Sequence, residues 1–224
     1  MPAALLDAPK PHTGLLVALW LNPGTAAQLA IPGGEPAEAL HCTLCYCGDV
    51  AEMDTLTLYR SVSAIDRSVS YRAPLEGRIA GYGRFNASDT SDAQDVFYAS
   101  VDIPELAAFR QDLANELTYA GCPPRASHGY TPHISLAYLD PGAENPVADV
   151  PSLPLRFNAV TVMLGEQRID IPLGGIGMGM SEACDRESGT WALFNALRDY
   201  AEAPEWVPYL PLPGEYSHPQ WGRI

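Results

Sequence analysis

The sequence predicts an α+β fold of two similar lobes, each of antiparallel sheet plus helices, with a C-terminal appendage. Short apolar segments bounded by glycine and proline alternate with two longer segments whose apolar residues have helical spacing. The motif His-x-[Thr/Ser]-Leu-x-Tyr occurs at residues 41–46 and again at residues 133–138, a separation of 92 residues (133 − 41). A repeat of this length indicates two similar lobes that each contribute one copy.

The first half of the chain predicts a strand–strand–helix order. Residues 14–21 (GLLVALWL) predict a buried strand, because the segment is short, apolar and closed by an NPG turn. A short helix is expected at residues 25–30, and residues 40–47 (LHCTLCYC) predict a second strand. Residues 49–69 predict a helix capped by Asp49, since apolar residues recur at helical spacing.

The second half adds further strands and one helix. Strands are predicted at residues 71–85, 95–103, 132–139, 153–165 and 166–174. The last two are expected to form a hairpin through Gly165 and Glu166. Residues 104–121 predict a helix, with Pro104 at a tolerated first-turn position and Gly121 as its stop.

Three regions are expected along the chain. Residues 1–13 form an N-terminal lead, residues 14–173 the bilobal domain, and residues 174–224 a flexible segment, a short helix and a tail rich in proline and aromatic residues. A tail that wraps over the core is favoured over a dedicated recognition segment. The N-terminus lacks a basic start followed by an apolar run, and no segment approaches the ~20 apolar residues of a membrane span. A cytoplasmic protein without a membrane partner is therefore expected.

Charge and cysteine content limit the classes of partner. With 27 acidic against 13 basic residues, the net charge of −14 argues against sequence-independent binding of long nucleic acid, which needs clustered cations. A small charged ligand in a local site stays compatible with this charge, and the oligomeric state is left open. Three of the five cysteines lie within residues 42–47, too close together for a secreted disulfide framework, so reduced thiols are expected.

The repeated motif predicts paired acid–base chemistry. The two-residue period of a strand places His41 with Thr43, and His133 with Ser135, on one face of each strand. Two imidazoles with two hydroxyl donors suit a phosphodiester, because one histidine can accept a proton while the other donates one. The hydroxyls would donate to the non-bridging oxygens as charge builds up, and neither a metal nor another cofactor is required.

The same alternation predicts the environment of the cysteines and tyrosines. It places Cys45 and Cys47 on the histidine face, and it turns Tyr46 and Tyr138 away from the histidines into the core. Ala137 takes the place of Cys45 in the second copy, which indicates packing and not metal binding. A zinc site is not expected, because ligands on opposite faces of a strand cannot converge on one ion.

The segments HCTL and YTPHISL resemble the two motifs of the 2H phosphoesterase superfamily. This superfamily includes LigT-like or 2′-5′ RNA ligase-like bacterial enzymes, RNA cyclic phosphodiesterases, and phage nucleases that destroy the cyclic oligonucleotide signals of bacterial anti-phage immunity. The resemblance covers roughly residues 14–174. It implies two pseudo-symmetric lobes around a central cleft, with His41 and His133 as catalytic residues and Thr43 and Ser135 as phosphate-binding residues.

The function expected from these features is that of a metal-independent phosphodiesterase acting on a cyclic oligonucleotide or a short 2′-5′ or 3′-5′ nucleotide. The acidic charge favours a small substrate and, within the resemblance, the phage immune-evasion (anti-CBASS) branch, which acts in the host cytoplasm. RNA 2′,3′-cyclic phosphate processing and a non-catalytic nucleotide-binding module are the alternatives. Trp20 and Tyr130 are candidates for stacking on a base, with core packing equally open. Three further histidines are expected to be structural: His12, His128 and His218.

Overall fold

The computed structural model describes residues 13–88, 91–125 and 129–174, which form one antiparallel eight-stranded sheet in the order β6-β3-β4-β5-β2-β1-β7-β8. The strands are β1 (Gly14–Trp20), β2 (His41–Asp49), β3 (Leu75–Phe85), β4 (Asp95–Asp102), β5 (His133–Leu139), β6 (Pro154–Phe157), β7 (Ala159–Leu164) and β8 (Gln167–Pro172). The helices are α1 (Pro23–Leu29), α2 (Thr55–Ser70) and α3 (Leu106–Tyr119), with short 3-10 helices η1 (Ala37–Ala39) and η2 (Val50–Glu52). The predicted α+β class is confirmed.

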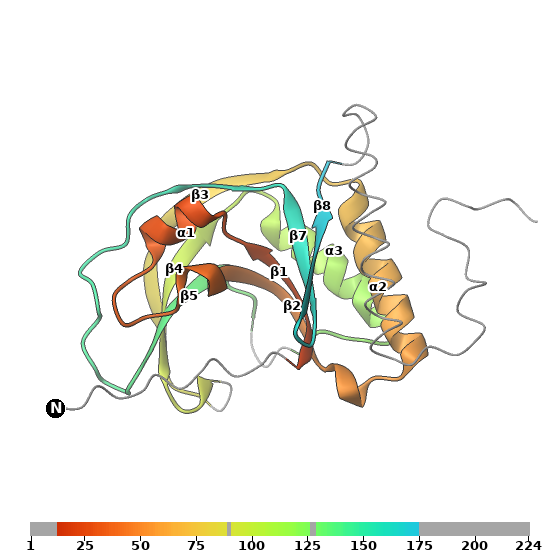
Figure 1. Cartoon of the computed structure of the whole chain (residues 1–224), viewed down its shortest axis with the longest axis horizontal. Coiled ribbons are helices and arrows are strands. Elements are labelled where there is room, and N and C mark those ends of the chain that lie inside the picture. Colours follow the sequence, from red (N-terminus) through yellow and green to blue (C-terminus); the bar gives the residue numbers. More distant parts are fainter. Residues whose placement is uncertain (1–12, 89–90, 126–128, 175–224) are drawn as a thin grey trace, which may run out of the picture.

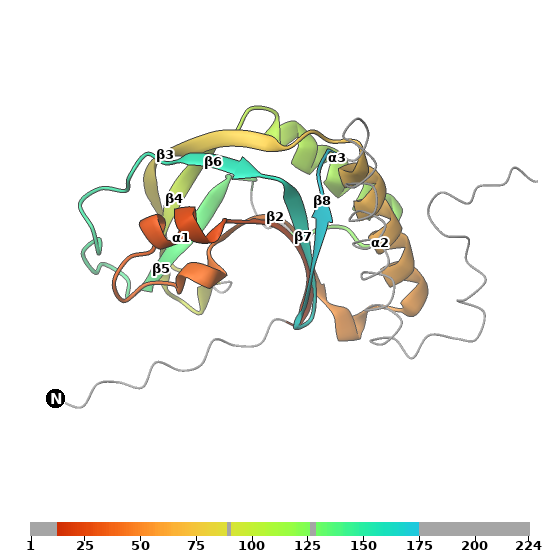
Figure 2. The same ribbon diagram turned by 45° about the horizontal axis from the view of Figure 1, so that its top comes forward.

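The two halves of the fold share one continuous sheet. β2 and β5, which carry the two motif copies, are hydrogen-bonded neighbours at its centre, and four strands lie in each half. Figures 1 and 2 show the sheet as strongly curved, with α2 and α3 packed side by side near β7 and β8. The larger of two clusters of buried apolar side chains lies between helices and sheet, and Phe97 of β4 and Phe109 of α3 are fully buried in it.

The helix boundaries differ from the prediction at their first residues. Asp54 caps α2 by accepting a hydrogen bond from the Thr57 amide, whereas Asp49 caps the short helix η2. The expected single helix is thus two, because two aspartates compete as caps five residues apart (54 − 49). Pro104 lies before α3 instead of in its first turn. The predicted stop at Gly121 is confirmed by its left-handed φ of 90°.

The predicted strand at residues 153–165 is divided in two. It bends at Asn158, so that β6 pairs with β3 in one half of the sheet and β7 pairs with β1 in the other. Hydrophobic residues recur along the whole segment, but it crosses from one half of the sheet to the other. Hydrophobic periodicity alone does not predict this crossing. The predicted hairpin through Gly165 and Glu166 is confirmed, with Gly165 at a φ of 59°.

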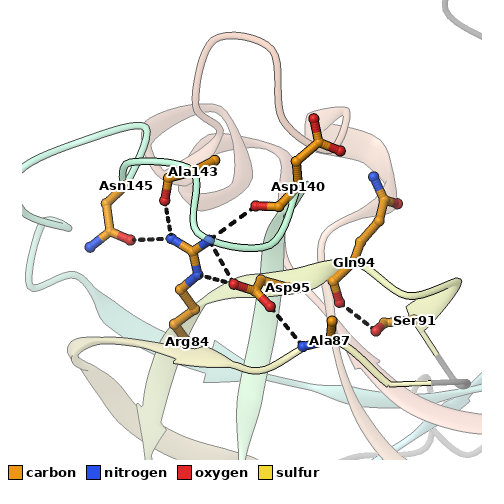
Figure 3. Close-up of polar contacts among 8 residues, drawn as sticks. All are labelled: Arg84, Ala87, Ser91, Gln94, Asp95, Asp140, Ala143 and Asn145. Atoms are coloured by element: carbon orange, nitrogen blue, oxygen red, sulfur yellow. Dashed lines mark hydrogen bonds and ion pairs between the residues drawn. The ribbon is translucent and has the colours of Figure 1, made fainter.

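Arg84 at the end of β3 joins three segments that are distant in the sequence. Its guanidinium forms a salt bridge with Asp95 of β4, 2.7 Å away, and both side chains are largely buried. It also donates to the loop after β5, to acceptors on Asp140, Ala143 and Asn145 (Figure 3). Asp95 in turn accepts from the Ala87 amide at 2.7 Å. This cluster fixes the loop against the β3–β4 pair.

Several predictions concern residues outside the described ranges. These are the N-terminal lead up to residue 12, the appendage beyond residue 174, and His12, His128 and His218. Among the described helices, none combines the length and apolar character that crossing a membrane would need.

Candidate active site

The strand register places the four residues of the repeated motif on one face of the central strand pair. β2 and β5 are antiparallel, with Cys42 paired to Ile134. The residues that flank this pair are His41, Thr43, His133 and Ser135. Extending the antiparallel register by one residue sets each histidine opposite the hydroxyl residue of the other strand. We call the face that carries these four residues the motif face, and the opposite one the core face.

Both histidines are held by the same backbone contact. The Nδ1 of His41 lies 2.7 Å from the carbonyl oxygen of Ala39, and the Nδ1 of His133 lies 2.7 Å from that of Thr131. Because a carbonyl oxygen only accepts, Nδ1 must carry the hydrogen in both rings. Proton transfer at either histidine therefore falls to Nε2, which accepts in the neutral ring and donates in the charged one.

A β-bulge interrupts both motif strands at the same position. The register of β2 with β1 skips Leu44, and the register of β5 with β4 skips Leu136. Each leucine is the fourth residue of its motif copy. A bulge inserts one extra residue, so the side chains after it change faces. The duplication therefore extends from sequence to backbone geometry.

The bulges make the predicted faces of the cysteines and tyrosines wrong. Cys45 and Cys47 lie in the core, with 2% and 6% of their surface exposed. Tyr46 and Tyr138 lie on the motif face instead, with 39% and 45% exposed. The prediction assumed unbroken two-residue alternation, which holds from the histidine to the leucine of each copy and fails after it.

His41 lies against an aromatic ring on the neighbouring strand. Trp20 of β1 pairs with His41, and the two rings stack at a centroid distance of 4.3 Å and an angle of 18°. The Trp20 Nε1 donates to the backbone oxygen of Glu38 at 2.9 Å, which fixes the indole. The Arg168 guanidinium of β8 lies 4.6 Å from the centre of the same indole. Trp20 is therefore next to a predicted catalytic residue.

His133 has a different aromatic environment. It meets Phe85 and Tyr98 edge-on, at centroid distances of 4.9 and 5.3 Å, and these two rings stack on each other at 4.2 Å. Gly83 leaves room for this stack, because a Cβ there would lie 2.3 Å from the Tyr98 hydroxyl. No sequence pattern predicts Phe85, Tyr98 and Arg168 at the site, since only the strand order brings them near the motif.

Residues 19–166, more than half of the chain, match a family described as the 2′-5′ RNA ligase superfamily. The chain belongs to this superfamily. The match confirms the resemblance to LigT-like 2H phosphoesterases that the doubled motif predicts, and with it the enzyme class, a phosphodiesterase. A comparison with curated proteins found no significant match.

Solved structures share the fold of this superfamily member. The protein TT0787 of Thermus thermophilus is 19% identical with a TM-score of 0.55, over 73% of this chain and 100% of that one. Escherichia coli LigT complexed with 3′-AMP is 17% identical with a TM-score of 0.52, over 73% of this chain and 96% of LigT. At these identities the likeness shows that the fold is LigT-like.

Cys42 and Cys45 of this 2′-5′ RNA ligase superfamily member have the environment of packing residues. Burial raises the pKa of the Cys42 thiol to about 11 and that of Cys45 to about 12, so both are protonated at neutral pH. Within residues 13–88, 91–125 and 129–174, no group of three or more His, Cys, Asp or Glu side chains is placed to hold a metal ion.

Tyr130, a candidate for substrate binding, lies on the other side of β2 from the motif residues. Its hydroxyl is 4.0 Å from the Sγ of Cys42, a side chain on the core face, and the Arg110 guanidinium lies 5.1 Å from its ring centre. Burial raises the pKa of this phenol. The structure thus does not bring Tyr130 together with the four motif side chains.

Glu35 lies at the Ser135 end of the motif face, and no sequence pattern predicts it there. Its amide donates to the Leu136 carbonyl at 2.8 Å, at the bulge of β5. Burial raises the pKa of the Glu35 carboxyl. Burial and the Glu35 charge both raise the pKa of Tyr138, whose hydroxyl is hydrogen-bonded to Ser135. A phenol therefore adjoins one phosphate-binding candidate, and the charge of the Glu35 carboxyl acts on that phenol.

Proposed function

We propose that this chain hydrolyses or transesterifies a phosphodiester by using His41 and His133 as a general acid–base pair. One observation carries the proposal: both rings are anchored at Nδ1 by a backbone carbonyl, which assigns proton transfer to Nε2 in each. The strand register supports it, since each histidine is set opposite a hydroxyl residue of the other strand. A phosphate between the two strands would meet both kinds of group.

The proposed reaction needs one proton accepted and one donated. The neutral histidine takes a proton from the attacking oxygen, either a neighbouring ribose hydroxyl or water, and the charged histidine gives a proton to the leaving oxygen as its bond to phosphorus breaks. Thr43 and Ser135 donate hydrogen bonds to the non-bridging oxygens. Each acid or base of this kind contributes about 10²–10⁴-fold in rate.

The proposed substrate is a short or cyclic oligonucleotide. The net charge of −14 disfavours a long polyanion, which supports a compact substrate. The complex of the fold relative E. coli LigT with 3′-AMP supports a nucleotide. Removal of a cyclic oligonucleotide immune signal by a phage protein is the corresponding biological proposal. Its test is whether expression of the chain lowers the concentration of such a signal in bacteria that produce it.

A second candidate reaction is the opening of an RNA 2′,3′-cyclic phosphate. The name of the superfamily, which refers to RNA, and the 3′-AMP bound to LigT favour it. It requires the same acid–base pair, and a mononucleoside 2′,3′-cyclic phosphate would then be turned over as fast as any oligonucleotide. A non-catalytic nucleotide-binding module would instead leave every substrate intact after prolonged incubation with stoichiometric protein.

The decisive experiment compares wild type with His41→Ala and His133→Ala. Each protein is incubated with cyclic dinucleotides, cyclic trinucleotides and 2′,3′-cyclic AMP in the presence of EDTA, and the products are separated by chromatography. Each substitution is expected to lower turnover at least 100-fold. Tyr119→Ala on α3, at a residue 88% exposed, is the control and should be unchanged. Undiminished turnover in either histidine variant contradicts the proposal.

A further inference from the structure

Some aromatic rings around the motif face stack on other protein side chains, and others remain exposed. Trp20 stacks on the first histidine, and Phe85 and Tyr98 stack on each other. Tyr46 and Tyr138, the last residues of the two motif copies, remain 39% and 45% exposed. Base-binding aromatic residues need an accessible ring face. The two motif tyrosines meet this condition best.

The two tyrosines lie at opposite ends of the four motif side chains. Each follows the central Cys42–Ile134 pair by four residues (46 − 42 and 138 − 134), and the strands are antiparallel. At a rise of about 3.3 Å per residue, each tyrosine is about 10–13 Å along its strand from the pair, in opposite directions. The histidines and hydroxyl residues therefore lie between two phenol rings.

Both tyrosines depend on the bulges for this position. Without the extra residue at Leu44 and Leu136, Tyr46 and Tyr138 would face the core. Tyr46 rests against the backbone of Gly14, where a Cβ would lie 2.4 Å from its ring. Two bulges, one in each copy of the motif, thus place a tyrosine on the motif face at both ends of the site.

We propose that Tyr46 and Tyr138 each stack on one nucleoside, so that the site takes an internucleotide linkage with a nucleoside on both sides of the phosphate. This rests on the function proposed above and names its substrate class. A pseudo-symmetric pair of rings matches a linkage that has a base on each side. A 2′,3′-cyclic phosphate or a mononucleotide ester has one nucleoside and can stack on only one of the two tyrosine rings.

The test uses two substrates that differ only in the leaving group. Adenylyl-adenosine, in its 3′-5′ and 2′-5′ forms, has a nucleoside on both sides of the phosphate, and the matching adenosine methyl phosphates have one. Wild type is expected to prefer the dinucleoside by about 5- to 100-fold in kcat/KM, the effect of stacking one base. Alanine in place of the tyrosine that stacks on the leaving nucleoside should abolish this preference. The other tyrosine stacks on the nucleoside that both substrates share, so its alanine variant should slow both equally.

Conservative variants separate the ring from the hydroxyl. Tyr46→Phe and Tyr138→Phe keep the ring and should stay within about threefold of wild type on both substrates. Tyr138→Phe is the stricter case, because the Tyr138 hydroxyl is bonded to Ser135. A phenylalanine variant as slow as its alanine counterpart overturns the stacking role. Tyr119→Ala serves as the matched exposed control, and circular dichroism checks the fold of each variant.

The outcomes distinguish this inference from the function on which it rests. If His41→Ala and His133→Ala cleave both substrates as fast as wild type, the acid–base function itself fails. If the histidines are required but neither tyrosine-to-alanine variant changes the dinucleoside preference, only the two-nucleoside site is overturned. A wild-type protein that cleaves the methyl ester as fast as the dinucleoside overturns it equally.

Discussion

At each histidine, a backbone carbonyl two residues earlier decides which ring nitrogen takes part in chemistry. The contacts to Ala39 and Thr131 have the same length, 2.7 Å, in the two copies. A main-chain acceptor cannot rotate away as a side chain can, so it holds the ring orientation as well as the tautomer. The aromatic neighbours of His41 and His133 differ, which gives the two histidines different surroundings within one repeated framework.

Removing one hydroxyl donor should slow the reaction without abolishing it. Ser135→Ala and Thr43→Ala are each expected to lower kcat by about 10- to 1000-fold, since each removes one hydrogen bond to the charge developing on the phosphate. The repeat supplies its own controls: Ser135→Thr and Thr43→Ser introduce the residue of the other copy and should retain most activity. Steady-state kinetics on a dinucleoside substrate measures this. Equal loss in Ser135→Ala and Ser135→Thr would contradict a donor role.

The buried thiol of Cys45 should be dispensable for activity. Ala137 takes its place in the second copy, and Cys45 is 2% exposed on the core face. Cys45→Ala is expected to cost about 1 kcal/mol in the free energy of unfolding, because a small buried group is removed, and to leave kcat within about twofold. Urea denaturation and kinetics measure the two effects. A large loss of activity at unchanged stability would show that the sulfur has a chemical role.

Local sequence patterns predict the strands well and their interruptions poorly. The helix stop at Gly121 and the hairpin at Gly165 follow from local backbone preferences, and both are confirmed. The bulges at Leu44 and Leu136 depend on pairing with β1 and β4, which no local pattern contains. Unbroken alternation therefore places the tyrosines in the core, although it places the histidine and hydroxyl residues correctly.

The end of α3 allows the cost of a left-handed backbone conformation to be measured without a change in side-chain packing. The amides of Gly121 and Cys122 donate to the carbonyls of Thr118 and Leu117, which closes the helix with Gly121 in the left-handed region. A Cβ at Gly121 would meet no atom closer than 3.8 Å, so the cost is conformational. Gly121→Ala is expected to lower the free energy of unfolding by about 1 kcal/mol, and Gly121→Asn by less. Urea denaturation checks the order; equal stability of all three proteins would contradict it.

The order of strands in the sheet assembles the site from distant parts of the chain. Phe85, Tyr98 and Arg168 come from β3, β4 and β8, yet all three lie beside a histidine or its stacking partner. The repeated motif predicted that two strands combine, because the copies are visible in the sequence. It could not predict one continuous sheet, since strand order depends on contacts between residues far apart in the chain.

The Arg84–Asp95 pair should make the stability of the whole fold depend on pH. Burial alone would raise the pKa of the Asp95 carboxyl, but hydrogen bonds from the Ala87 amide and the Arg84 guanidinium outweigh burial and lower it. A carboxyl with a lowered pKa in the folded state stabilises the protein above its unfolded pKa of about 4. That stabilisation is lost as the pH falls through the lower, folded pKa.

Asp95→Asn should therefore be less stable than wild type at pH 7 and at pH 5, with a difference that shrinks as the pH falls from about 4 toward about 2. The asparagine cannot bind a proton there, while the wild-type carboxylate becomes neutral. Urea denaturation at several pH values measures the difference. Asp102→Asn, in the exposed pair with Arg78, is the control and should show little change at any pH, because exposed pairs contribute little. An Asp95→Asn deficit of the same size at every pH would mean that packing, and not the charge of Asp95, holds the loop against β3 and β4.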